Sequence, residues 1–257
     1  MPLELFHAHN STCSQKVRIC LAEKGAVEGR DWISRPVNLA ARENLTPEFL
    51  AINPNGVVPA FRHEGRPIYE STVMCEYLEE IWPDTPRVSP ANPIDRAQMR
   101  GWLRYIDEVP SMAVRVPSFH HLFKPAFEQM SEAAFDAFVN ANPLRKYFFR
   151  RMGRDGFSQA DYDAAIDQLD QSFARMEAAL DGHDWLVADL FSIADICSIP
   201  TFVRLEDLRL AHLWEQKYPR VSAWYVRAQA RPSFAAAYYD GSRVSHLMPN
   251  DTAGATA

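Results

Sequence analysis

A proline-rich segment at residues 84–93 divides the chain into two parts with different hydrophobic patterns. It contains Pro86, Pro90 and Pro93, and because proline lacks an amide hydrogen such a segment favours neither helix nor strand and is typical of a linker. Before it, short apolar runs alternate with helical patterns. After it only helical patterns recur. We therefore predict a mixed α/β domain over residues 1–83, a linker over 84–93 and an all-helical domain over 94–240.

The order of elements in the first part restricts its fold. The pattern predicts strands at 3–6, 32–37, 57–61 and 68–69, and helices at 12–24, 46–52 and 70–82. A strand, a helix and a second strand form a parallel crossover, and the last two strands form a hairpin. This order is typical of a thioredoxin-like domain. Pro59 interrupts the third strand, which leaves open either an edge strand or a cis peptide bond at Val58-Pro59.

The second part shows helical patterns with two local exceptions. Residues 114–157 are rich in phenylalanine and tyrosine, and such a set either packs as a core or lines an apolar binding site. Residues 241–257 are small and polar and are expected to form a mobile tail. Ser192 and Asp195 have the spacing of a capping box at the start of a helix, for which we expect a structural role.

Composition excludes several classes of function. The chain has 257 residues, 47% of them hydrophobic, and a net charge of −6 with interspersed signs. Such a surface favours neither nucleic acid nor an anionic membrane as a partner. The sequence shows no bilayer-length apolar run and no basic leader, so we expect a cytoplasmic protein. Its four cysteines are scattered and no metal-ligand spacing occurs, so we expect reduced thiols and no metal.

The segment Ser11-Thr12-Cys13-Ser14 lies where the first strand gives way to the first helix. The free amides and the dipole at a helix N-terminus favour an anion and lower the pKa of a thiol. The alternative is that a hydroxyl here only caps the helix. Cys13 distinguishes this turn from an ordinary cap, because a thiolate is a nucleophile.

With Gln15-Lys16-Val17-Arg18, this segment resembles the serine- and cysteine-containing signature of zeta-class glutathione transferases and of the related glutathione-dependent reductive dehalogenases. Residues 53–59 (Asn-Pro-Asn-Gly-Val-Val-Pro) and Glu70-Ser71 resemble the glutathione site of the same superfamily. Residues 65–79 resemble the bacterial β-etherases. The capping box and residues 231–234 also match the superfamily, so the resemblance covers nearly the whole chain. It implies a thioredoxin-like N-terminal domain and an all-α C-terminal domain.

The resemblance also implies roles for individual residues. Val58 and Pro59 would pair with the cysteinyl part of glutathione, Glu70 and Ser71 would hold its γ-glutamyl end, and Asn10 and Thr12 would complete the site. Ser11 is the first candidate donor to the glutathione thiolate. Cys13 is the second catalytic candidate, because its thiolate would attack the sulfur of a glutathione conjugate.

We therefore expect a glutathione transferase, with glutathione as co-substrate, acting on a hydrophobic, aromatic electrophile. Conjugation, reductive dehalogenation and β-aryl ether cleavage all fit the same residues. Residues 114–157 lie where the family forms its electrophile site. The family implies a homodimer. The alternative is a non-catalytic protein of this fold that binds ligands or partners.

Overall fold

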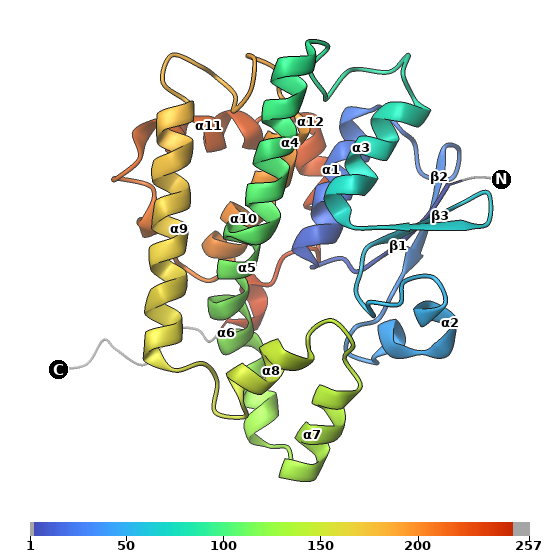
Figure 1. Ribbon diagram of the computed structural model, residues 1–257, viewed down its shortest axis with the longest axis vertical. Coiled ribbons are helices and arrows are strands. Elements are labelled where there is room, and N and C mark those ends of the chain that lie inside the picture. The colour runs from blue at the N-terminus through green and yellow to red at the C-terminus, as the bar shows by residue number, and fades with distance from the viewer. Residues whose placement is uncertain (1–2, 249–257) are drawn as a thin grey trace.

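The computed structural model describes residues 3–248, which form a four-stranded sheet with helices against it, followed by a helical domain (Figure 1). The first part comprises β1 (Leu3–His7), α1 (Thr12–Glu23), β2 (Trp32–Pro36), the 3-10 turn η1 (Glu43–Leu45), α2 (Pro47–Leu50), β3 (Ala60–His63), β4 (Arg66–Tyr69) and α3 (Ser71–Ile81). The second comprises α4 (Pro93–Glu108), α5 (Pro110–Ala113), α6 (Arg115–Glu128), α7 (Glu132–Asn140), α8 (Lys146–Met152), α9 (Gln159–Ala179), α10 (Ile193–Asp207), η2 (Ala211–Leu213), α11 (Pro219–Gln229), α12 (Pro232–Ala237) and η3 (Ser245–Leu247).

The sheet has the order β2-β1-β3-β4. The first two strands are parallel, with Leu5 opposite Ser34, and the other two pairs are antiparallel. The parallel crossover and the hairpin are thus as predicted, which confirms the thioredoxin-like domain followed by a helical domain. The third strand starts later than predicted: residues 57–59 precede it, because Pro59 has no amide hydrogen to contribute to the sheet.

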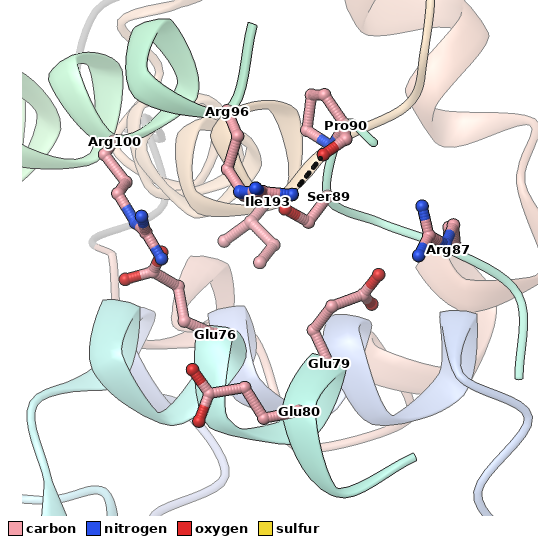
Figure 2. A pocket seen from close by; sticks show the side chains of 9 residues that line it. All are labelled: Glu76, Glu79, Glu80, Arg87, Ser89, Pro90, Arg96, Arg100 and Ile193. Carbon is pink, nitrogen blue, oxygen red and sulfur yellow. Dashed lines mark hydrogen bonds and ion pairs between the residues drawn. The ribbon is translucent and has the colours of Figure 1, made fainter. Parts of the chain in front are cut away.

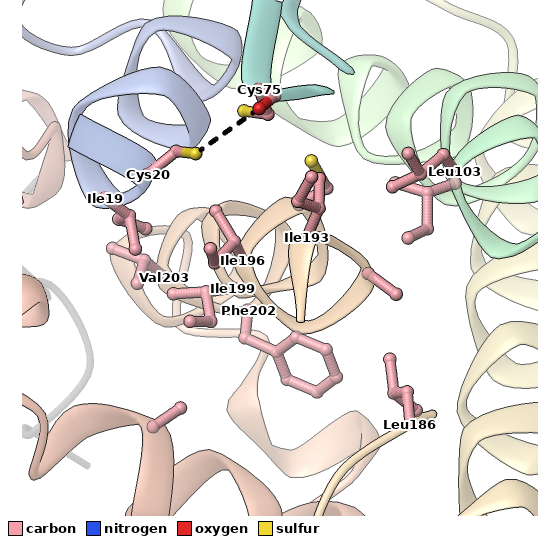
Figure 3. Close-up of a cluster of buried hydrophobic side chains, with 14 of the residues drawn as sticks. Ile19, Cys20, Cys75, Leu103, Leu186, Ile193, Ile196, Ile199, Phe202 and Val203 are labelled. Carbon is pink, nitrogen blue, oxygen red and sulfur yellow. Dashed lines mark hydrogen bonds between the residues drawn. The ribbon is translucent and has the colours of Figure 1, made fainter. Parts of the chain in front are cut away.

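Helix α10 is the centre of the core that joins the two parts. Nearly all of its residues are buried, and it packs on α1, α3 and α4. Figure 3 shows Ile196 and Ile199 facing Ile19 of α1, with Cys20 and Cys75 close by. The Sγ of Cys20 donates to the main-chain oxygen of Cys75 at 3.8 Å, and all four cysteines are free. One continuous core therefore spans both parts.

The proline-rich segment joins α3 to α4 and packs against this core. Val88 is buried, and its carbonyl accepts a hydrogen bond from the amide of Ile193. The expected mobile tail needs correction for residues 241–248: Ser242 and Val244 are buried, and the amide of Val244 donates to Asp207. The rest of that tail, residues 249–257, lies outside the described residues.

Residues 114–157 form α6, α7 and α8, at the end of the helical domain nearest α2 (Figure 1). Their aromatic side chains build a second small core around Phe127, Phe135 and Phe149. Most of the predicted aromatic set therefore packs as core. Phe119 belongs to this core and also lines a cleft, together with the more exposed Phe123. No helix between residues 3 and 248 has the length and apolarity needed to cross a membrane.

Candidate functional site

The N-terminus of α1 is one wall of a cleft between the two parts of the chain. Ser11 is the N-cap, in extended conformation, and its Oγ accepts a hydrogen bond from the amide of Ser14 at 3.3 Å. Ser11, Thr12 and Cys13 are only partly buried. Capping uses a lone pair of Ser11, so its hydroxyl hydrogen stays available to a ligand in the cleft.

Two walls meet across this cleft. The thioredoxin-like wall consists of Asn10, Ser11, Thr12, Cys13, Leu39, Asn44, Gly56, Val57 and Val58, and the helical wall of Val114, Arg115, Ser118, Phe119, Leu122, Phe123, Asn142, Arg145, Arg204 and Val244. The first wall contains most of the residues predicted from the sequence. The second adds part of the aromatic set of residues 114–157, for which lining a binding site was one of the two alternatives. It also adds three arginines, which were not among the predicted site residues.

The turn before β3 brings Val58 to the cleft. Two asparagine side chains hold this turn in place. Asn53 donates to the carbonyl of Val57 and Asn44 of η1 to that of Gly56, both at 2.7 Å. Gly56 has a φ of +62°, and a Cβ there would lie 3.0 Å from Leu45, so the turn needs glycine. The Val58-Pro59 peptide bond is cis, which resolves the alternative left open by the sequence.

Glu70 and Ser71 lie outside the residues that line the cleft but are linked to it. Glu70 is the N-cap of α3 with a φ of +73°, and its carboxylate accepts a hydrogen bond from Asn55 in the turn that carries Val58. Ser71 is buried at the start of the helix. The structure therefore brings Asn10, Ser11, Thr12, Cys13 and Val58 into one cleft and places Glu70 and Ser71 beside the adjoining turn.

Asp107 of α4 connects the two helix starts. It accepts hydrogen bonds from Lys16 at 3.0 Å and from Thr72 at 2.7 Å. Lys16 is buried and also donates to Ser111. In the sequence, Lys16 stands out only as a position of the signature, because its partner Asp107 lies far along the chain.

The cations around Cys13 favour its thiolate. Burial raises the pKa of the Cys13 thiol, but Lys16, Arg115 and Arg145 together outweigh burial, so the pKa is lowered from its ordinary value; Asp107 opposes this change. These three cations lie on α1, on α6 and in the loop before α8, and none of them was predicted from the sequence as a site residue. Arg204 of α10 was also missed, and its Nη2 donates to the carbonyl of Asn10 at 2.6 Å.

Other clusters of polar residues are neutralised by their own partners. Figure 2 shows a cleft between α3 and α4 in which Arg100 pairs with Glu76 at 2.6 Å and Arg96 donates to Pro90. Its acidic and basic side chains balance, so it attracts neither kind of ion. Among residues 3–248, no group of histidine, cysteine and carboxylate side chains is arranged to hold a metal.

Comparisons with known proteins agree with this architecture. Residues 10–81 match the glutathione S-transferase N-terminal domain model and residues 128–232 the C-terminal domain model. Protein LigF of Sphingobium sp. strain NBRC 103272 / SYK-6 is 34% identical over 95% of each chain, and glutathione S-transferase TCHQD of Arabidopsis thaliana is 26% identical over 94% of this chain and 92% of its own. The crystal structure of beta-etherase LigF from strain SYK-6 superposes with a TM-score of 0.82 at 32% identity, covering 92% of this chain and 98% of that one. The chain therefore belongs to the glutathione S-transferase family.

Proposed function

We propose that this protein uses the thiolate of glutathione to attack a hydrophobic aromatic electrophile, with β-aryl ether cleavage as the first reaction class. The observation that carries the proposal is the cleft itself, which sets Ser11 and Cys13 opposite Phe119 and Phe123. The similarity to LigF, which is 34% identical in sequence and whose crystal structure is that of a beta-etherase, supports the choice of ether cleavage.

Glutathione is proposed to lie along the thioredoxin-like wall. The main chain of Val58, beside Pro59, pairs with its cysteinyl part. Glu70 accepts from its ammonium, while the hydroxyl and amide of Ser71 bind the adjacent carboxylate at the start of α3. Asn10 and Thr12 complete this wall. The glutathione sulfur then lies at the N-terminus of α1.

Activation of the nucleophile is assigned to Ser11. A free thiol has a pKa near 8.5, so only about a few per cent is thiolate at neutral pH. The Ser11 hydroxyl donates to the thiolate, and the helix dipole adds to its stability. In ether cleavage the sulfur forms a bond to the carbon that bears the aryloxy group, the carbon–oxygen bond breaks, and the aryloxide leaves and takes up a proton from water.

A second reaction, reductive dehalogenation, is favoured by one observation: the pKa of Cys13 is lowered by Lys16, Arg115 and Arg145 despite burial. After glutathione displaces halide from a halogenated hydroquinone, the Cys13 thiolate would attack the sulfur of the thioether. The ring carbon leaves with the electron pair and takes a proton. A mixed disulfide of Cys13 and glutathione remains, and a second glutathione releases it as glutathione disulfide.

Mass spectrometry after turnover separates these reactions. The protein is incubated with glutathione and either a β-aryl ether or a halogenated hydroquinone, and products and adducts on Cys13 are followed. A stable glutathione thioether with released phenol, lost in Ser11→Ala but kept in Cys13→Ser, supports ether cleavage. Dehalogenated product with a Cys13 adduct supports the second reaction. Binding to immobilised glutathione without turnover of either substrate would instead identify a non-catalytic binding protein.

The active form is proposed to be a homodimer, as in other members of the family. Sedimentation at several concentrations gives its mass. A mass of one chain throughout would reject the dimer without affecting the proposed chemistry.

A further inference from the structure

The charge of the cleft is opposite to that of the molecule. The chain carries a net charge of −6, yet its cleft is lined by Arg115, Arg145 and Arg204. No aspartate or glutamate is among the described residues that line it. Concentrated positive charge at a cleft in an acidic protein attracts an anionic ligand.

Within residues 3–248, neither Arg115 nor Arg145 has an acidic partner. Arg204 is occupied by the carbonyl of Asn10. Arg115 contacts only the sulfur of Met112 at 2.8 Å among the interactions described, and the buried Nε of Arg145 has no hydrogen-bond partner within residues 3–248. Burial and, to a smaller extent, the charge of Arg115 lower the pKa of Arg145 to about 10, against the opposing effect of Cys13. An anion between the two guanidinium groups would relieve this repulsion and satisfy the unpaired donor.

An apolar, aromatic surface adjoins the two cations. The guanidinium of Arg145 lies over the ring of Phe119, 5.4 Å from its centre. Phe119 stacks on Phe123 with ring centres 4.6 Å apart and an interplanar angle of 14°. Leu122 extends the same surface into the cleft. A ligand that fits this wall is an aromatic ring with an acidic substituent at one edge.

We propose that the electrophile is an aryl compound that carries a carboxylate, with its ring against Phe119 and Phe123 and its carboxylate between Arg145 and Arg115. The forked guanidinium matches the planar carboxylate. All these residues belong to the helical wall, across from Ser11 and Val58, so glutathione and the carboxylate occupy different sides of the cleft. The reaction of the bound compound rests on the proposed function, but its binding does not.

Binding is tested with two probes of the same shape. Calorimetry compares 4-ethoxybenzoate with neutral 4-ethoxybenzamide on the protein saturated with S-methylglutathione. We expect the benzoate to bind at least roughly tenfold more tightly, the effect of a charge-assisted pair. Arg145→Gln and Arg115→Gln should each remove most of this preference. Arg150→Gln on α8, an exposed arginine that contacts Asn140, should keep it.

Two binding results would overturn the inference. One is equal binding of the two probes by the unaltered protein. The other is a preference for benzoate that disappears when S-methylglutathione is present, because the arginines would then hold a carboxylate of glutathione itself.

Turnover separates this inference from the proposed function. Two β-aryl ethers are compared, one with a carboxylate on its aryl ring and one with the methyl ester. Faster cleavage of the acid, lost in Arg145→Gln, supports both proposals. Equal cleavage of both, without preferential binding of benzoate, rejects the inference and keeps the function. Preferential binding without cleavage of either ether rejects the function and keeps the inference.

Discussion

Three cations that come from separate parts of the chain lower the pKa of the Cys13 thiol. Lys16 is the only one of them on the same helix, and it stays charged: burial lowers its pKa, but Cys13, Cys197 and Asp107 raise it more. Removing this charge should raise the pKa of Cys13 by roughly one pH unit. The measurement is the pH dependence of Cys13 alkylation by iodoacetamide, followed by peptide mass spectrometry, in Lys16→Met and the unaltered protein.

Two further variants check this cause. Arg115→Gln keeps the pair of Lys16 with Asp107 and should shift the alkylation midpoint in the same direction. Arg150→Gln should leave it unchanged. If neither Lys16→Met nor Arg115→Gln moves the alkylation midpoint, then burial and the helix dipole, rather than the cations, set the pKa of the Cys13 thiol.

The sequence allowed Cys13 to be identified but not its surroundings. A hydroxyl and thiol cluster between a strand and a helix is a local pattern, so Ser11, Thr12 and Cys13 were predicted together. Arg115 and Arg145 lie about a hundred or more positions further on, and only the packing of the helical domain brings them to the cleft. A pattern of neighbouring residues does not indicate contacts between residues so far apart in the sequence.

The elements around the cleft are held by Asp107, which joins α1 and α3 to α4. Asp107→Ala should lower the free energy of unfolding by about 2 kcal/mol, because it leaves the charge of buried Lys16 without a carboxylate. Glu108→Gln is the matched control. Its pair with Arg104 is exposed, so its loss should cost about 0.3 kcal/mol. Urea unfolding measures both, and equal losses would contradict a structural role for Asp107.

The two capping boxes differ in burial and in the further partners of their aspartates, since Asp161 also pairs with Arg151, and they form a second test. Asp195 is buried and accepts from the amides of Leu186 and Ser192 and from Nε1 of Trp224. Asp195→Ala leaves these donors unpaired, so we expect a loss of about 3 kcal/mol in unfolding free energy. Asp161→Ala in the exposed box of α9 should cost about 1 kcal/mol. Similar losses at both sites would show that burial does not matter.

Local patterns predicted the start of α10, because a cap acts over three residues. They were less accurate where an element depends on distant contacts. The small, polar sequence after Gly241 indicates a tail, yet residues 242–244 pack on Gln15 and Asp207. Likewise the aromatic residues of 114–157 gave no indication of which rings enter the second core and which face the cleft.

One continuous core spans both parts of the molecule, so we expect a single buried titrating group to affect the stability of both. His7 joins β1 to β2 through Ser34 at 2.8 Å and to α1 through Arg18 at 3.3 Å. Burial, Arg18 and His9 lower its pKa from 6.5 to about 3. The folded protein keeps His7 neutral, whereas the unfolded chain binds a proton there below pH 6.5.

Folding should therefore weaken as pH falls from about 6.5 toward 3, because the unfolded state binds more protons in that interval. We expect a loss of roughly 2 kcal/mol from His7 by about pH 5. Urea unfolding of the unaltered protein and of His7→Asn, followed by tryptophan fluorescence and by helical circular dichroism, measures this loss.

The His7→Asn variant should show a shallower pH dependence of the unfolding free energy. The remaining dependence comes from His120 and His121, whose pKa values burial also lowers. If His7→Asn keeps the full slope, the acid sensitivity lies elsewhere, and if the two signals separate, the two parts do not unfold together.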